Sequence, residues 1–318
     1  MNPFFCADLS RGAGEDIIGS APAYQTYIFI ECPQPWTTNV WDSKAVPPNL
    51  KAFIENVNRS HREIKFLLIS ADKPNPSSKA RVIAFGRNCS PSAGYTRREF
   101  RVNMHKVVPL LERYLANPEE LALQPPTHRP IRDFFVCTHG SHDKCCSRYG
   151  YPFFRQARTI AFNLGLRDVR VWQVSHIGGH RFAPTMISFP DGRYYGALDS
   201  ESFAAIARRQ GDIGCMEKVY RGWGILPRNA QVLERELFLQ YGWDWFNYRV
   251  SCQILEERPS FLRVELFCEK PGVHSQVYEA ELVENEDKTV YLRGSCSSEK
   301  VSPFPKFTLK KLRVLSPV

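Results

Sequence analysis

Two short stretches of the sequence hold most of the side chains that could bind a soft metal ion. The first begins at Cys137 and reads Cys-Thr-His-Gly-Ser-His-Asp-Lys-Cys-Cys-Ser-Arg-Tyr-Gly. The second begins at Ser175 and reads Ser-His-Ile-Gly-Gly-His-Arg-Phe-Ala-Pro. Thiolate and imidazole ligands favour zinc or an iron-sulfur centre over magnesium or calcium, which prefer oxygen. The candidate ligands are Cys137, His139, His142, Cys145, Cys146, His176 and His180.

Each of these stretches follows a predicted β-strand. Residues 133–137 read as one strand, residues 151–164 as a helix and residues 169–174 as the next strand. The carboxyl ends of two parallel strands in a βαβ unit emerge at the same edge of a sheet, so we expect the two loops to lie close together. The sequence therefore permits a four-ligand metal site built from both loops.

The spacing of the cysteines bears on which metal they would bind. Structural zinc sites usually take their cysteines about two to four residues apart. Eight residues separate Cys137 from Cys146, and such a wide loop is better suited to a two-iron cluster. Gly178 and Gly179 lie between the two histidines of the second stretch, where they allow a sharp turn and leave room for a bulky cluster. They also disfavour the helix that a metalloprotease zinc motif requires.

Both stretches resemble a known family. They are similar to the sucrase/ferredoxin-like family, thioredoxin-fold ferredoxins in which two cysteines and two histidines hold a 2Fe-2S cluster. The start of the chain adds to the likeness, so that it covers roughly residues 1–225. One departure is His142, because the family commonly has Arg before the aspartate. The matching segments at the start are Cys6-Ala-Asp-Leu-Ser, Gly19-Ser-Ala-Pro and Tyr27-Ile-Phe-Ile-Glu followed by Pro35-Trp36.

The resemblance implies a ligand set and a function. Cys137 and Cys146 would bind one iron of the 2Fe-2S cluster, His176 and His180 would bind the other, and Cys145 is the alternative to Cys146. Neutral imidazoles in place of thiolates raise the reduction potential relative to all-cysteine ferredoxins. We expect a proton-coupled one-electron carrier rather than an enzyme. Glycosidases use two facing carboxylates, and the sequence beside these loops contains no such pair, so it does not support sucrase activity.

Two other functions use the same residues. The four predicted ligands could close a structural zinc site, in which case the protein is a zinc-binding protein. Alternatively, the adjacent Cys145 and Cys146 stand at the start of a predicted helix, where a thiol pKa is lowered, and could serve a thiol oxidoreductase. The chain offers no Cys-x-x-Cys pair at this position, which weighs against the second alternative.

The remaining cysteines and histidines are interpreted as ordinary residues. His139 and His142 are expected to be solvated loop side chains. In a reducing compartment, isolated cysteines pack as small apolar residues. This interpretation covers Cys89, Cys215, Cys252, Cys268 and Cys296, together with His61, His105, His128 and His274.

The order of predicted elements repeats along the chain. A βαβ unit followed by a hairpin and a helix is the layout of a thioredoxin-like sheet. We therefore predict an α/β fold with two tandem thioredoxin-like units, residues 1–125 without a metal site and residues 126–228 with the cluster, joined at the Pro-rich run 124–130. The first unit contains predicted strands at 24–31, 64–70, 81–87 and 98–103 and helices at 49–58 and 106–115. The second continues after residue 174 with strands at 185–189 and 193–198, a turn at Pro190-Asp191-Gly192 and a helix at 202–209.

Residues 229–318 are predicted to form a helix and a small antiparallel β region. The helix spans residues 232–240, and a hairpin turn is expected at Asn285-Glu286-Asp287-Lys288. Nothing in this region resembles a catalytic set, so we expect it to pack or dock. Its predicted strands are 249–255, 262–268, 276–283, 290–293 and 307–314.

Length and charge agree with this organisation. A chain of 318 residues is long enough for two domains, and its formal charge of +9 divides into +3 for residues 1–125, +7 for 126–230 and −1 for the rest. The excess is arginine rather than a lysine-rich tail, which argues against nucleic-acid binding. It favours docking of an acidic redox partner. The candidate docking residues near the ligands are Arg148, Arg155, Arg158 and Arg181.

The sequence also bears on where the protein works. No run approaches the roughly 20 apolar residues of a membrane span, and the first residues do not resemble a secretory leader. We therefore expect a cytoplasmic protein with no membrane partner. The sequence gives no indication of oligomeric state.

Overall fold

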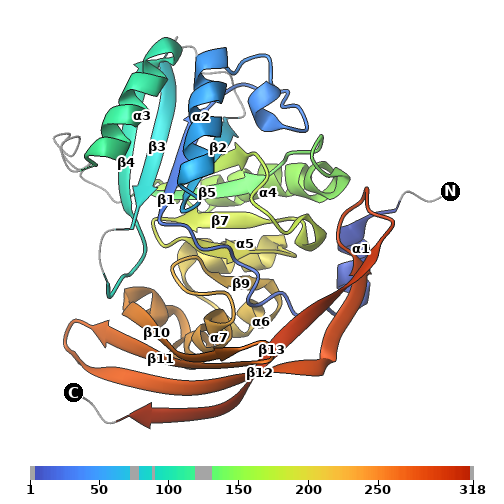
Figure 1. Cartoon of the computed structure of the whole chain (residues 1–318), viewed down its shortest axis with the longest axis vertical. Helices are drawn as coiled ribbons and strands as arrows, with labels where there is room; N and C mark the ends of the chain where they lie inside the picture. The colour runs from blue at the N-terminus through green and yellow to red at the C-terminus, as the bar shows by residue number, and fades with distance from the viewer. Residues whose placement is uncertain (1–3, 72–78, 88–89, 119–130, 316–318) are drawn as a thin grey trace.

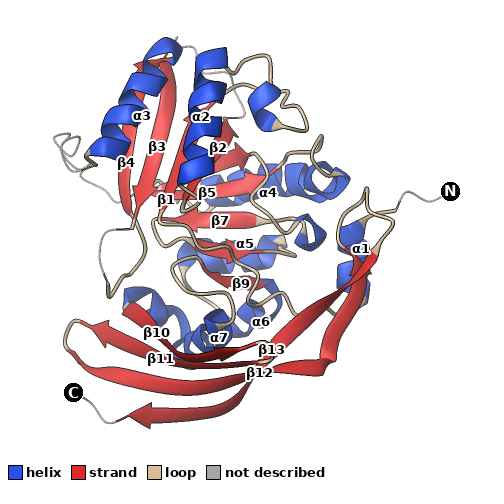
Figure 2. Ribbon diagram, viewed as in Figure 1, coloured by secondary structure: helices blue, strands red, loops and turns tan. Residues whose placement is uncertain are grey.

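The computed structural model describes residues 4–71, 79–87, 90–118 and 131–315. These residues form a mixed α/β structure with a nine-stranded mixed sheet and a four-stranded antiparallel sheet. Figure 1 shows the four-stranded sheet curving along one side of the molecule, with the connection between its last two strands beside the N-terminal helix. Figure 2 shows the helices packed about the large sheet and the long strands of the smaller one.

The first half of the large sheet contains four strands in the order β4-β3-β1-β2. Strand β1 pairs in parallel with β2 and antiparallel with β3, which pairs antiparallel with β4. This is the arrangement expected of a βαβ unit followed by a hairpin. The elements are β1 (Thr26–Glu31), α2 (Pro48–Ser60), β2 (Ile64–Ser70), β3 (Lys79–Gly86), β4 (Thr96–Asn103) and α3 (Val107–Ala116).

The second half repeats this order as β6-β5-β7-β8 and adds a ninth strand, β9. The two halves are joined where β2 and β6 pair antiparallel, through Ile69 with Val174 and Ser70 with Gln173. The predicted elements are therefore present, while β9, the short helix α6 (Met216–Val219) and the helix α1 (Cys6–Gly12) were not predicted. The elements are β5 (Arg132–Cys137), α4 (Tyr151–Asn163), β6 (Val169–Val174), β7 (Met186–Phe189), β8 (Arg193–Tyr195), α5 (Ser200–Arg208) and β9 (Tyr220–Trp223).

Alternation along the strands divides the core of the first half into two faces. Ile28 and Ile30 of β1 pack in a core with residues of α2 and α3, whereas Tyr27 and Phe29 face a core shared with the second half. Phe29 stacks on Phe135 of β5 with ring centroids 3.8 Å apart, and both rings are fully buried. The two halves of the sheet therefore share one aromatic core.

The C-terminal region begins with a helix and continues as four long strands. One prediction is wrong here: β12 runs unbroken through residues 285–288, where a hairpin turn was expected. Its residues pair with β13 on both sides of this polar run, through Asn285 with Lys306 and Val290 with Phe304, so the extra residues form an irregularity within the strand. The elements are α7 (Ala230–Tyr241), β10 (Arg249–Arg258), β11 (Phe261–Lys270), β12 (Val273–Arg293) and β13 (Val301–Leu315).

Some residues singled out in the sequence lie outside the part of the chain that the structure describes. The Pro-rich run 124–130 lies outside the described residues, as do Cys89 and His128. No helix among the described residues is long and apolar enough to cross a membrane.

Candidate metal centre

The two ligand-bearing loops leave the same edge of the large sheet, as predicted. Cys137, the last residue of β5, is paired in parallel register with Val174, the last residue of β6. The first loop returns through a π-helical turn, Cys146–Gly150, that leads into α4. A Cβ atom at Gly150 would lie 2.0 Å from the carbonyl oxygen of Cys137, so only glycine lets this turn pack directly on the strand end.

Three of the four predicted ligands lie together. The ligand atoms of Cys137, Cys146 and His176 are all within 4.8 Å of one another, and we call these residues the Cys137 group. The Sγ atom of Cys146 lies 3.9 Å from Nδ1 of His176. Both cysteines are buried, and the imidazole is partly exposed. A hydrogen bond from Cys146 lowers the pKa of the Cys137 thiol well below its ordinary value, and the same bond raises the pKa of Cys146.

The fourth predicted ligand, His180, lies outside this group. Its ring centroid is 5.3 Å from that of His176. Its Nδ1 atom is 3.3 Å from Oδ2 of Asp143 and 3.4 Å from Sγ of Cys6. Burial lowers the pKa of His180 to about 4, so the imidazole is neutral at pH 7.

His139 and His142 have different environments. The expectation of a solvated His139 is wrong, because its side chain is buried between the two loops. Its Nε2 atom is 2.8 Å from the carbonyl oxygen of Thr37, and its Nδ1 accepts a hydrogen bond from the backbone N–H of His176 at 3.3 Å. His139 therefore positions His176. His142 is exposed, and its ring stacks on that of His176 with centroids 4.0 Å apart.

Cys145 belongs to a second group of potential ligands. Its Sγ lies with those of Cys6 and Cys296 and with a carboxylate oxygen of Asp143, all within 4.8 Å of one another; we call these four residues the Cys6 group. The expectation that Cys296 is an ordinary residue is therefore wrong. No local spacing signalled this group, because Cys6 and Cys296 lie near opposite ends of the chain and only the fold brings them to Asp143 and Cys145.

The other isolated residues stand apart from both groups. Among the described cysteines, Cys215, Cys252 and Cys268 belong to neither group. The histidines interpreted as ordinary are exposed where they are described. These are His61, His105 and His274.

The loop that carries the two histidines is held by a buried guanidinium. Arg221 donates hydrogen bonds to the carbonyl oxygens of Gly178 at 3.0 Å and Ser20 at 2.9 Å. Gly179 has a φ of +74°, and a Cβ atom there would lie 2.6 Å from Nη2 of Arg221. Burial lowers the pKa of Arg221 to about 10, which still leaves it charged at neutral pH. The glycine therefore lets a buried cation approach the loop.

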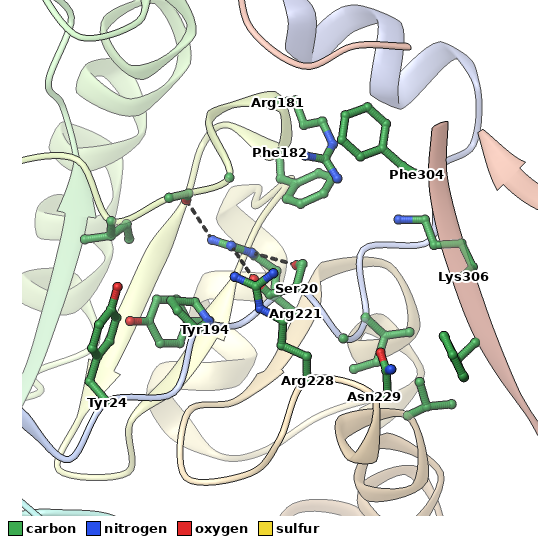
Figure 3. Close-up of a pocket in the computed structure, with 18 of the residues that line it drawn as sticks. Ser20, Tyr24, Arg181, Phe182, Tyr194, Arg221, Arg228, Asn229, Phe304 and Lys306 are labelled. Atoms are coloured by element: carbon green, nitrogen blue, oxygen red, sulfur yellow. Dashed lines mark hydrogen bonds between the residues drawn. The ribbon is translucent and has the colours of Figure 1, made fainter. Parts of the chain in front are cut away.

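A basic cavity of about 510 Å³ opens beside His176. Among the described residues, no carboxylate lines it. Arg181 and Lys306 each form an ion pair with Glu15, at 2.9 and 2.8 Å, while Arg228 is exposed. Figure 3 shows Arg181, Arg221, Arg228 and Lys306 around this space. The cationic residues that line it are Lys65, Arg181, Arg221, Arg228 and Lys306.

The four arginines predicted to dock a partner lie on different elements. Arg155 and Arg158 are exposed on α4, and Arg148 is exposed in the turn before it. Arg181, next to His180, is largely buried in its ion pair with Glu15. Docking by these residues stays a prediction.

The comparisons with known proteins are consistent with the chemistry of the two loops. The sequence model of the Sucrase/ferredoxin-like family matches residues 17–222, a range that contains the whole Cys137 group. No curated protein and no solved structure matched the chain. Because the matched range is well over half of the 318 residues, the chain belongs to the sucrase/ferredoxin-like family.

Proposed function

We propose that this protein is an electron carrier that binds a 2Fe-2S cluster through Cys137, Cys146, His176 and His180. The observation that carries the proposal is the Cys137 group, in which two buried thiols and an imidazole lie within 4.8 Å of one another. Soft sulfur and borderline nitrogen donors fit iron-sulfur ligation. The proposal includes the thioredoxin-like fold of both halves of the sheet, and it places the cluster unit in residues 126–228.

The residues around the site have distinct tasks in this proposal. A bound 2Fe-2S cluster would supply one-electron redox chemistry. Cys137 and Cys146 supply thiolates from a buried position, which excludes water from that side. The ring of His139 accepts a hydrogen bond from the backbone N–H of His176 and so positions that residue. Arg221 donates a hydrogen bond to the loop between the two histidines and holds it in place. Both imidazoles are partly exposed, so solvent protons can reach them, and Nδ1 of His180 also lies 3.3 Å from Oδ2 of Asp143.

A spectrum and a metal analysis test the cluster directly. Protein purified in air is expected to be coloured, to bleach with dithionite, and to contain iron and acid-labile sulfide in equal amounts. A colourless protein with zinc at this site would contradict the proposal. Cys137→Ala and Cys146→Ala are each expected to lose the cluster, whereas Cys145→Ala keeps it because this thiol belongs to the other group.

Proton coupling is tested by a redox titration at several pH values. The reduction potential is expected to fall as pH rises, because the added electron favours protonation of the imidazoles. His176→Cys and His180→Cys should each keep a cluster with a lower potential and a weaker pH dependence, since a thiolate replaces a neutral ligand. A wild-type potential that stays flat from mildly acid to alkaline pH would contradict proton coupling.

We also propose that an acidic redox partner docks at the basic cavity beside His176. Its cationic lining would attract carboxylates and speed their association at low ionic strength. The test is stopped-flow oxidation of the reduced protein by ferricyanide, an anion, and by hexaamminecobalt(III), a cation. Arg228→Gln is expected to slow only the first reaction, whereas Arg208→Gln, an exposed arginine on α5 outside the cavity, should change neither. Equal rates for wild type and Arg228→Gln would contradict the proposed docking site.

A further inference from the structure

The Cys6 group brings together three thiols from distant parts of the chain. Cys6 is the first residue of α1, Cys145 lies in the loop after β5, and Cys296 lies in the connection between β12 and β13. Cys6 and Cys145 are buried, and Cys296 is partly exposed. Figure 1 shows the connection between the last two strands beside α1. Three thiols are therefore in mutual contact where three segments of the chain meet.

The distances between the sulfur atoms are close to, and slightly shorter than, those around one tetrahedral zinc ion. Cys145 Sγ lies 3.3 Å from that of Cys296 and 3.5 Å from that of Cys6, and Cys6 and Cys296 are 3.7 Å apart. Zinc–sulfur bonds of about 2.3 Å in a tetrahedron place neighbouring sulfurs about 3.8 Å apart. A single disulfide would use two of the thiols and leave the third without a role. Three sulfurs this close leave room for one ion and not for an iron-sulfur cluster.

Asp143 completes the set of ligands. One of its oxygens lies 3.9 Å from Sγ of Cys6. The carboxylate is held in place by the backbone N–H groups of Cys145, at 2.8 Å, and Cys296, at 3.0 Å. The side chain that would close the tetrahedron is thus fixed by two of the residues that supply the thiolates. Hydrogen bonds to a carboxylate ligand commonly fix its orientation toward a metal ion in this way.

We propose that Cys6, Cys145, Cys296 and Asp143 bind a structural zinc ion. Three thiolates favour zinc over magnesium or calcium, and four protein ligands close the site to substrate. The ion would link α1 and the connection between β12 and β13 to the loop that carries Cys146. This gives the C-terminal sheet a role in fixing the redox loop. His180, which the proposed function assigns to the 2Fe-2S cluster, lies beside this site, with Nδ1 3.3 Å from Oδ2 of Asp143 and 3.4 Å from Sγ of Cys6. The choice of Asp143 as the fourth zinc ligand therefore rests on that assignment of His180.

Metal analysis of matched variants tests the site. Purified wild-type protein is expected to retain about one zinc per chain, a stoichiometry set by the single set of four ligands. Cys296→Ala should lose this zinc and, if the proposed function is right, keep its iron and sulfide. Cys252→Ala removes another partly exposed cysteine of the C-terminal sheet and should keep both metals. Circular dichroism shows whether each variant is folded.

Cobalt provides a readout that does not depend on the iron-sulfur cluster. A Cys137→Ala background removes the cluster absorption, and after its zinc is removed with a chelator, Co²⁺ added to this protein should produce thiolate-to-cobalt charge-transfer bands. A further Cys296→Ala substitution should abolish them. The zinc site is overturned if wild-type protein retains no zinc and the background protein gives no cobalt bands. It is also overturned if Cys296→Ala keeps its zinc, or if peptide mapping of native, alkylated protein finds a disulfide within the group.

Discussion

At the scale of single residues, the two glycines of the histidine loop have different tasks. Both have positive φ, +84° at Gly178 and +74° at Gly179, where a side chain is strained. A Cβ atom at Gly178 would meet nothing within 4 Å, whereas at Gly179 it would lie 2.6 Å from the guanidinium of Arg221. Gly178 is therefore needed for the turn alone, and Gly179 for the turn and for the approach of a buried cation.

This difference predicts a graded effect of alanine substitution. Gly178→Ala should lower the free energy of unfolding by about 1–2 kcal/mol, the cost of a left-handed conformation. Gly179→Ala should cost more, because Arg221 or the loop must also move. It should reduce the iron content as well, since the displaced loop carries His176 and His180. Urea unfolding and iron analysis of the two variants measure both effects, and equal losses would show that Arg221 does not constrain the loop.

How far the sequence predicts the site depends on the distance between its residues along the chain. Cys137, Cys146 and His176 could be brought together from the sequence because two parallel strands deliver their loops to one edge of the sheet. Cys6 and Cys296 could not, because their positions depend on α1 and on a C-terminal hairpin whose packing has no local signature. The burial of His139 was missed for a related reason: its partner, Thr37, lies in the segment between β1 and α2, far from His139 along the chain.

At the scale of elements, the helices and strands were predictable and their assembly was less so. Apolar alternation and the turn at Pro190-Asp191-Gly192 place the elements of both halves within a few residues of where they lie. The pairing of β2 with β6, which joins the halves into one sheet, involves two residue pairs among the described residues and has no sequence signal of its own. The expected turn at residues 285–288 was wrong, because polar residues in a long strand can form an irregularity as well as a hairpin.

Helix α7 is anchored to the large sheet by a buried ion pair. Arg193 of β8 and Glu234 of α7 are both fully buried, with Nη1 and Oε1 2.6 Å apart. The same oxygen accepts a hydrogen bond from Nε1 of Trp245 at 2.8 Å, and the guanidinium lies 3.8 Å from the ring centroid of Trp223. These contacts tie the start of the C-terminal region to β8 and β9.

Removing one charge of this pair is expected to destabilise the protein strongly. Glu234→Gln leaves a buried, unpaired guanidinium and should lower the free energy of unfolding by about 3–5 kcal/mol. Glu256→Gln breaks an exposed ion pair with Arg258 in β10 and should have little effect. Urea unfolding of both variants compares them. A small loss for Glu234→Gln would mean that water or a neighbouring group compensates the arginine.

At the scale of the whole molecule, Glu15 joins three segments that are far apart in sequence. Its buried carboxylate pairs with Arg181, beside the ligand candidate His180, and with Lys306 of β13. The carboxylate of Glu15 therefore links the N-terminal segment to the histidine loop and to the C-terminal sheet. Burial raises the pKa of Glu15, but the hydrogen bonds and charges of Arg181 and Lys306 outweigh burial and lower the pKa below its ordinary 4.5.

The lowered pKa predicts the pH range in which this junction stabilises the fold. A carboxylate whose pKa is lower in the folded state than in the unfolded state stabilises the fold fully above the unfolded-state pKa, near 4.5. This stabilisation is lost as the pH falls through the folded-state pKa. Glu15→Gln should therefore cost about 3 kcal/mol near pH 7, with the difference from wild type shrinking once the pH drops below about 4.5. Urea unfolding of both proteins from pH 7 downwards measures this difference, and Glu217→Gln, which replaces an exposed carboxylate, should cost little throughout. A difference that stays constant through the acid range would mean that Glu15 contributes through packing rather than through its charge.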